Sequence, residues 1–306
     1  MTDTRTIRRR AIVFLAATLA LSALTASAAP ADSARIDPAA FGKPIFVETF
    51  QTLDAGQDQP PRGKPHRWRT VHGYGDAADA ANRNGILALY VDGDFGGIAG
   101  GKALPGSLNI NPFEHRPGLL TIVARPSDPS LRSKLLNKPY TSGLLNTRLS
   151  FAAKNAYFEG EIKLPRGRGL FPAFWLMPQV SVWPEGGEID IMEQLGKDTH
   201  VAFASIHAKN IHHTKEVKLG FDAAGDFHRY GVAYTPTEIV WYFDRREVHR
   251  MPTPPDVKDP MYILLNLAVG GDWAGEPDAS TPFPARMHVR EIKVWSLPPS
   301  WSAPRP

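Results

Sequence analysis

The sequence predicts an all-β protein built as a two-sheet sandwich. Short runs of alternating or continuous apolar residues recur along the chain, and turns rich in proline and glycine separate them, with 28 Pro and 26 Gly among 306 residues. No long helical periodicity interrupts this pattern. Because many short strands expose fewer edges when they form two packed sheets, a sandwich is the favoured architecture.

The predicted strands follow one another through most of the chain. Their ranges are 45–50, 86–91, 119–123, 143–151, 157–164, 173–177, 189–193, 201–207, 228–234, 239–243, 262–268 and 287–295. Between the first two strands, residues 54–81 are rich in Pro, Gly, Asp and Ala and predict a long loop that could border a cleft. We find no internal repeat and no second module, so residues 45–297 are expected to form a single domain.

The first 28 residues have the pattern of a secretory signal peptide. A basic start that ends in Arg8-Arg9-Arg10 precedes an apolar run over 11–24, and Ala26-Ser27-Ala28 is a small-x-small cleavage signal. The apolar run is too short to cross a bilayer comfortably. We therefore expect an exported, periplasmic or extracellular protein without stable membrane insertion, with residues 29–44 as a flexible leader and 298–306 as a tail.

Composition narrows the class of protein further. The chain has no cysteine, so an exported form would depend on its core and not on disulfides. Its formal net charge of +4 includes the basic leader, and Lys and Arg are scattered, so no nucleic-acid partner is expected. About 278 residues remain after the predicted cleavage, which is ample for one large core.

The most informative motif is the heptapeptide Gly-Glu-Ile-Asp-Ile-Met-Glu at 187–193. In a strand, Glu188 and Asp190 share one face because alternate side chains point the same way. Glu193 would point backwards unless one extra residue bulged out near Ile191 or Met192. With such a bulge, three acids line one wall of a groove, as glycoside hydrolysis by paired carboxylates requires.

An acidic strand face is more often simply solvated, and this alternative has to be weighed. The residues between and around the acids are apolar or glycine, and the aromatic-rich segments 169–175 and 182–184 come just before them. Sugar rings stack on aromatic faces, so acids beside Trp and Phe in a cleft favour a catalytic role in carbohydrate chemistry.

The sequence resembles the glycoside hydrolases of family 16. The resemblance is carried by Tyr157-Phe158-Glu159, 162–165, 169–178, 187–196, 227–230, 241–244 and 265–271, and it runs in order from about Phe46 to Trp295. The acid motif is specific to the family, and the extra Met192 marks the bulged, laminarinase-like form. The resemblance implies a β-jelly roll whose concave sheet forms the substrate cleft.

The resemblance also implies the roles of the three acids. Glu188 would be the nucleophile, Glu193 the general acid/base and Asp190 an assisting residue between them. Such a pair gives net retention through a covalent glycosyl-enzyme intermediate. Short segments at 89–92, 111–113 and 140–143 resemble the subgroup of bacterial succinoglycan-type depolymerases and β-glucanases. The expected substrate is therefore a β-1,3- or β-1,4-linked glucan or bacterial exopolysaccharide, cut within the chain.

Six further residues are expected to bind substrate. They are Trp175, Trp183, His207, Asn266, Trp273 and Glu159. The two tryptophans before the acid motif offer stacking surfaces, and an Asn amide can bond sugar hydroxyls. A core role for Trp175, a structural role for His207 and an ordinary turn at Gly270-Gly271 remain the alternatives.

No cofactor or metal is expected. His212 and His213 are not accompanied by a ligand pattern. Relatives often carry an Asp that helps hold a structural calcium where this chain has Arg290, which disfavours that site. The expected partner is a polysaccharide, and the expected state is a monomer. The alternatives in function are a transglycosylase, which intercepts the same intermediate with a sugar, and a carbohydrate-binding protein on a degenerate hydrolase fold.

Overall fold

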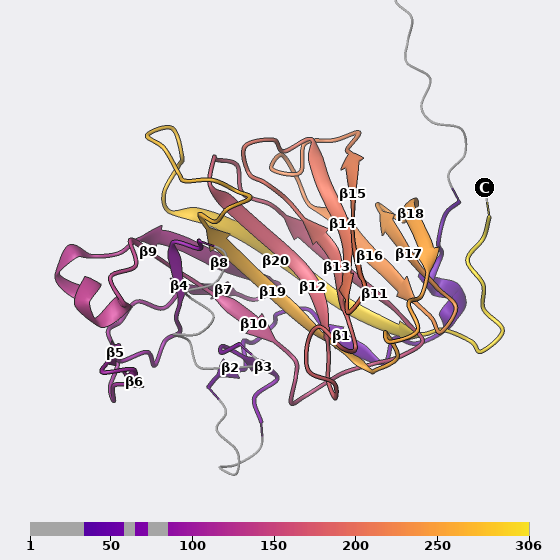
Figure 1. Cartoon of the computed structure of the whole chain (residues 1–306), viewed down its shortest axis with the longest axis horizontal. Coiled ribbons are helices and arrows are strands. Elements are labelled where there is room, and N and C mark those ends of the chain that lie inside the picture. Colours follow the sequence, from indigo (N-terminus) through magenta and orange to yellow (C-terminus); the bar gives the residue numbers. More distant parts are fainter. Residues whose placement is uncertain (1–33, 58–64, 73–84, 306) are drawn as a thin grey trace, which may run out of the picture. The chain divides into compact units, whose positions relative to one another are not determined.

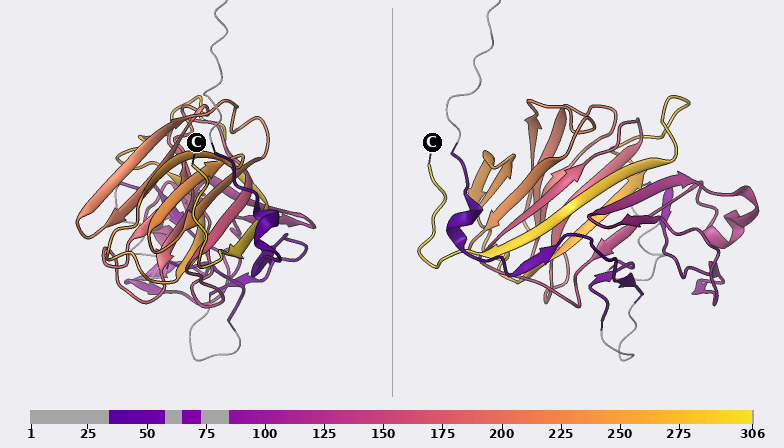
Figure 2. Two further views of the ribbon diagram at one scale, coloured as in Figure 1. Left: turned by 90° about the vertical axis from the view of Figure 1, so that its right-hand side faces the viewer. Right: turned by 180° about the vertical axis from the view of Figure 1, so that it is seen from behind.

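Two large β-sheets pack face to face in the computed structural model, which describes residues 34–57, 65–72 and 85–305 (Figure 1). The ten-stranded sheet contains, in order, β18 (Arg246–Pro252), β17 (Glu238–Phe243), β16 (His228–Tyr234), β11 (Ala156–Lys163), β20 (Ala285–Ser296), β8 (Leu119–Pro126), β9 (Tyr140–Ser142) and β4 (Ala88–Tyr90), with β1 (Phe46–Glu48) paired to β20 and β7 (Phe113–Arg116) paired to β8. Figure 2 shows β1 beside the long β20 from behind.

The eight-stranded sheet carries the concave face. Its order is β15 (Ile211–Lys218), β14 (Val201–Ala208), β13 (Glu188–Glu193), β12 (Leu170–Pro178), β19 (Met261–Val269), β10 (Leu144–Asn146), β3 (Trp68–Arg69) and β2 (Ala55–Gly56). The remaining elements are the hairpin β5 (Ile98–Ala99) and β6 (Lys102–Ala103) and the 3-10 helices η1 (Pro38–Phe41) and η2 (Pro129–Leu135). The predicted all-β, two-sheet jelly-roll sandwich is confirmed.

Each sheet contributes one side of its strands to a shared core. On β12, Leu170, Phe174 and Leu176 are buried between the sheets. The alternate residues of the same strand, such as Phe171 and Trp175, face the concave side. A strand with one apolar face inside and one face in a cleft has this alternation because successive side chains point to opposite sides.

Each of the predicted strands overlaps an observed one, but β15 and β18 were not predicted, and neither were the shorter β5, β6, β7 and β9. Five consecutive residues of β15, His212 to Glu216, are exposed, and two of them, Lys215 and Glu216, are charged. An edge strand with this composition lacks both the alternation and the apolar run that identify a strand in a sequence. The predicted loop over 54–81 also contains β2 and β3, while 58–64 and 73–84 lie outside the described residues.

The predicted flexible leader is wrong for residues 34–44. Ile36 is buried, and its amide donates to the carbonyl of Arg245, while Glu247 donates its amide to the carbonyl of Ala34. The segment then forms η1, capped by Asp37. An apolar side chain and backbone hydrogen bonds to the neighbouring β18 hold it on the outer face of the ten-stranded sheet. Residues 29–33 and the predicted signal peptide lie outside the described residues.

The predicted tail after residue 297 contains no regular element in its described part, yet it packs against the sheet. Ala303 is buried in a small cluster with Tyr157 and Tyr242, and Trp301 lies against the edge of that cluster. Among the described residues, no helix is long and apolar enough to cross a bilayer.

Candidate active site

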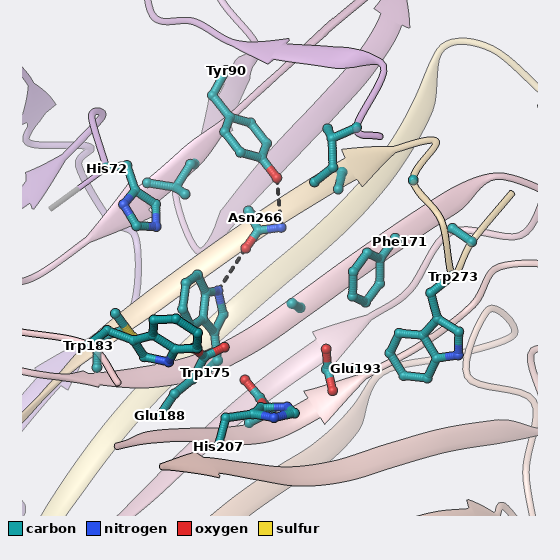
Figure 3. A pocket seen from close by; sticks show the side chains of 18 of the residues that line it. His72, Tyr90, Phe171, Trp175, Trp183, Glu188, Glu193, His207, Asn266 and Trp273 are labelled. Carbon is teal, nitrogen blue, oxygen red and sulfur yellow. Dashed lines mark hydrogen bonds and ion pairs between the residues drawn. The ribbon is translucent and has the colours of Figure 1, made fainter. Parts of the chain in front are cut away.

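A cleft of about 830 Å³ crosses the concave face of the eight-stranded sheet. Eight of the nine site residues predicted from the sequence line it, namely Glu188, Asp190, Glu193, Trp175, Trp183, His207, Asn266 and Trp273. They come from four neighbouring strands and from two loops that border the sheet (Figure 3). The ninth residue, Glu159, lies elsewhere.

A β-bulge brings the three acids to one side of β13. Asp190 pairs with Ser205 on β14, and the next register pair joins Glu193 to Phe203, so two residues of β13 stand opposite one residue of its neighbour. Ile191 and Met192 are both buried in the core between the sheets. Because two successive residues face the core, Glu193 returns to the cleft side, where the sequence predicts it.

Hydrogen bonds join the three carboxyls to their surroundings. Asp190 and the indole of Trp183 each donate a hydrogen bond to the side chain of Glu188. The hydroxyl of Ser205 donates to Oε2 of Glu193 over 2.8 Å. Glu188 therefore receives two donors that stabilise its anion, while Glu193 receives one.

The pKa values of all three acids are raised. Burial, with the charge of Glu193 added to it, raises the pKa of Glu188 to about 7. Burial also raises the pKa of Glu193 to about 7, against the hydrogen bond from Ser205. For Asp190, burial and the two neighbouring carboxylates raise the pKa well above its ordinary value. Near neutral pH the group therefore holds both a proton donor and an anion, as acid–base chemistry requires.

His207 closes the side of the cleft on β14. Its Nε2 lies 3.4 Å from Oδ2 of Asp190, and that oxygen has no hydrogen bond within the described residues. Its Nδ1 lies 3.1 Å from Nδ1 of His212. Burial and the nearby His212 lower the pKa of His207, which favours the neutral ring.

A hydrogen-bonded chain fixes the indole of Trp175. The indole nitrogen donates to Oδ1 of Asn266 over 2.7 Å, and Nδ2 of Asn266 donates to the hydroxyl of Tyr90 over 3.1 Å. Figure 3 shows the three side chains in line across the sheet. Because the indole is held by its edge, its face is presented to the cleft as a flat surface suited to a sugar ring.

Two further tryptophans stand at the borders of the cleft. Trp183 is 41% exposed and Trp273 is 42% exposed, which is unusual for so large an apolar side chain. Trp273 packs edge-on against Phe171 and lies 4.6 Å, centroid to centroid, from Phe203. In Figure 3 these two indoles lie on opposite sides of the acids. The cleft therefore offers stacking surfaces on both sides of its charged centre.

The prediction that Glu159 faces the cleft is wrong. Glu159 lies on β11 of the ten-stranded sheet, is 2% exposed and sits on the outer side of that sheet with Tyr157. Arg229 and Arg245 donate to its carboxylate over 2.9 Å, and the Tyr157 hydroxyl donates over the same distance. Alternation along β11 places Phe158 in the core and therefore turns Glu159 away from the cleft.

Sequence reasoning missed Ser205 and the role of Tyr90. Ser205 stands two residues before His207 on the same strand, so the alternation that placed His207 in the cleft could have identified it. Tyr90 lies in a predicted strand, but nothing in that strand indicates which of its faces meets Asn266. Only the paired strands bring these two residues together, across 176 positions in the sequence.

No group of three or more potential metal ligands occurs among the described residues. At the position that disfavoured calcium, the guanidinium of Arg290 lies 3.7 Å over the ring of Phe227 and contacts Glu161. The positively charged side chain of Arg290 therefore occupies this position on β20.

The chain matches the model of glycosyl hydrolases family 16 over residues 121–285, which is more than half of its length. The chain belongs to glycosyl hydrolase family 16. The matched span includes the bulged strand β13, its partners β12 and β14, and the Asn266 strand β19.

Among curated proteins, this family-16 hydrolase is 40% identical over 196 residues to endo-1,3-1,4-beta-glycanase ExsH of Rhizobium meliloti, an alignment that covers 63% of this chain and 41% of that protein. It is 34% identical over 183 residues to a beta-glucanase of Rhodothermus marinus, covering 52% of this chain and 63% of that protein. The chain thus spans less than half the length of the first of these relatives.

Two solved structures cover this family-16 hydrolase more fully. An endo-beta-1,3-glucanase from Pyrococcus furiosus aligns with a TM-score of 0.64 and 30% identity, over 83% of this chain and 94% of that one. The laminarinase catalytic domain from Thermotoga maritima aligns with a TM-score of 0.65 and 28% identity, over 83% and 98%.

Proposed function

We propose that this family-16 hydrolase is an endo-β-glycanase that cleaves β-1,3 or β-1,4 links in a glucan or bacterial exopolysaccharide with net retention. The observation that carries the proposal is the row Glu188, Asp190 and Glu193 on the floor of the cleft, with all three pKa values raised. A solvated acidic face would be exposed, whereas Asp190 is buried and hydrogen-bonded to Glu188, and Glu193 is hydrogen-bonded to Ser205 of the cleft wall.

The surroundings of the acids support different roles. Glu188 accepts hydrogen bonds from Asp190 and Trp183, which favour its anion, so it is assigned as nucleophile. Burial and the charges of Glu193 and Glu188 raise the pKa of Asp190 well above its ordinary value, which favours the protonated carboxyl that donates to Glu188. Glu193 keeps its proton near neutral pH and is assigned as general acid.

The reaction then proceeds in two steps. Glu188 attacks the anomeric carbon while Glu193 gives its proton to the departing glycosidic oxygen, which leaves a glycosyl ester on Glu188. In the second step, Glu193 takes a proton from water, the water oxygen bonds to the anomeric carbon, and the ester bond to Glu188 breaks. Two inversions at one carbon give net retention.

The cleft and the relatives support a polysaccharide substrate. Trp175, Trp183 and Trp273 offer stacking surfaces along a groove that crosses the sheet, which suits several consecutive sugar rings and cleavage within a chain. The names of the relatives, an endo-1,3-1,4-beta-glycanase and an endo-beta-1,3-glucanase, favour glucose-containing β-linked polymers.

We also propose that the protein is exported, acts without a cofactor and works as a monomer. The basic, then apolar, then small-residue pattern of residues 1–28 supports export. If it is exported as proposed, N-terminal sequencing of the secreted protein will begin at Ala29.

Azide rescue of two variants tests the function and the roles together. The purified protein is incubated with laminarin, mixed-linkage β-glucan and succinoglycan-type polymer, and reducing ends are counted. Glu188→Ala and Glu193→Ala should each lose at least about 10³-fold in kcat on the polymer that the wild type cleaves. With azide and an activated aryl glycoside, Glu193→Ala should yield a β-glycosyl azide and Glu188→Ala an α-glycosyl azide.

Glu185→Ala is the matched control, because Glu185 is exposed, paired with Lys209 and outside the cleft lining. It should keep wild-type activity. Binding of a polymer without any release of reducing ends would favour a carbohydrate-binding protein instead. Inverted product in an NMR time course would contradict the retaining mechanism.

A further inference from the structure

The β-bulge in β13 is contacted by a hydrogen bond that comes from the opposite sheet. The bulge falls between Asp190 and Glu193, where the register to both neighbouring strands shifts. At this point the carbonyl of Asp190 accepts a hydrogen bond from the other sheet: the indole nitrogen of Trp241 donates to it over 2.8 Å. A buried carbonyl in an apolar core requires such a donor, because an unpaired one is strongly disfavoured.

Trp241 is fixed on all sides by the core. It lies on β17 of the ten-stranded sheet, with no exposed surface. The ring of His249 on the neighbouring β18 stacks on it, with 5.1 Å between centroids, and the ring of His213 stacks on His249 in turn. The indole N–H is therefore held in one direction, toward the bulge.

We propose that Trp241 is a positioning residue that fixes the bulge and so keeps Glu193 in the cleft. The inference rests on the proposed function. Loss of the indole N–H removes the hydrogen bond that holds the carbonyl of Asp190 toward the opposite sheet, and with it a contact that favours the bulged backbone. A strand without the bulge points Glu193 to the core side. The opposite sheet thus holds the geometry of the acids although it contributes no side chain to their reaction.

The position of Trp241 makes this role separable from substrate binding. Trp241 lies on the ten-stranded sheet and is not among the residues that line the cleft, whereas the stacking residues Trp175, Trp183 and Trp273 are. Loss of its N–H should therefore change the turnover number and leave substrate affinity nearly intact.

The test compares Trp241→Phe with Trp68→Phe at a temperature well below both melting transitions. Trp68 is also fully buried, and its indole nitrogen donates to Glu48 over 3.1 Å, outside the cleft lining. Each variant loses one buried indole N–H. Trp241→Phe should lower kcat at least tenfold on the polymer that the wild type cleaves, with KM within about threefold, whereas Trp68→Phe should lower the melting temperature and leave kcat within twofold.

A second variant keeps the shape of the side chain. Benzothienylalanine at position 241 replaces the indole N–H by sulfur, so it should fold where Trp241→Phe does not and should show the same loss of kcat. A kcat within twofold of wild type in this variant would overturn the proposal.

A crystal structure of the same variant provides a readout that needs no substrate. The proposal expects a shifted register after Asp190 and Glu193 displaced from the cleft, and an unchanged bulge would overturn it. If the wild type cleaves none of the polymers, the proposed function fails, while the crystal structure still decides whether Trp241 holds the bulge.

Discussion

Glu193 sits in surroundings that favour its protonated form, and this links its proposed role to stability. Burial raises its pKa from about 4.5 to about 7. A carboxyl whose folded pKa is raised binds its proton more tightly in the folded than in the unfolded chain. Its contribution to stability is complete below pH 4.5 and is lost as the pH rises through about 7. At mildly alkaline pH, where Glu193 is charged, the folded protein is therefore less stable.

Glu193→Gln should consequently stabilise the protein at pH 8 and not at pH 5. A neutral amide fills the same volume, and it can still accept from Ser205. A pKa shift of this size corresponds to about 3 kcal/mol in the free energy of unfolding, or several degrees in melting temperature. Thermal denaturation at both pH values measures it. Glu185→Gln, at an exposed position, is the control; a gap between wild type and Glu193→Gln that is equal at pH 5 and pH 8 would contradict the argument.

At the scale of the element, β11 carries a buried ionic cluster on its outer side. Burial opposes ionisation of Glu159, but the hydrogen bonds and charges of Arg245 and Arg229 hold its pKa below the ordinary value. Glu161, next on the same face, pairs with Arg229 and Arg290. Glu159 was predicted to bind substrate. The face of β11 that carries it instead joins this strand to its neighbours β16 and β20 and to the turn after β17.

Glu159→Gln should destabilise the fold without changing catalysis. Removal of the carboxylate leaves two half-buried arginines without their shared partner. We expect this to lower the free energy of unfolding by about 2–4 kcal/mol. Because the pKa of Glu159 is lowered, its contribution exists above pH 4.5 and is lost as the pH falls below that value. The difference in melting temperature should therefore be large at pH 7 and shrink in acid, with kcat unchanged. Glu114→Gln, at a half-exposed ion pair, should show little effect; loss of kcat in Glu159→Gln at full folding would return Glu159 to the substrate site.

At the scale of the whole molecule, the two ends of the described chain cover the outer side of the ten-stranded sheet. Trp301 meets Phe41 of η1 edge to face, with 6.0 Å between centroids. Arg250 donates to the carbonyl of Pro304, and the amide of Ala303 donates to Glu238. Segments that the sequence marks as leader and tail thus seal an apolar cluster on the side opposite to the cleft.

Truncation after Leu297 should lower the melting temperature and leave kcat and KM unchanged. The loss of Trp301, Ala303 and two hydrogen bonds is expected to lower the free energy of unfolding by about 1–3 kcal/mol. A chain that lacks only residues 305–306 retains these contacts and is the control. Equal melting temperatures for the two truncations would show that the tail does not support the sheet, and lost activity would show that it reaches the cleft.

Much of the fold follows from local patterns. The apolar strands, such as the largely buried β12 and the fully buried β19, contain runs of apolar residues, and most of their length was predicted from that pattern alone. β15 could not be predicted because five consecutive residues of this edge strand are exposed, and β18 could not because its half-buried apolar residues, Val248 and Met251, are too few to form a run. The loop around β2 and β3 forms short strands only because β10 offers an edge to pair with.

The sequence by itself determined the acid row, since the spacing of Glu188, Asp190 and Glu193 with one extra residue requires a bulge for all three to share a face. The sequence could not decide which sheet carries a given residue. Glu159 and Asn266 both lie in strands that the sequence predicts, yet only Asn266 reaches the cleft. Nor could it reveal Trp241, which meets Asp190 across 51 positions. Alternation fixes the face of a residue within its strand, whereas contact across two sheets depends on how the sheets pack, and packing is a property of the whole chain.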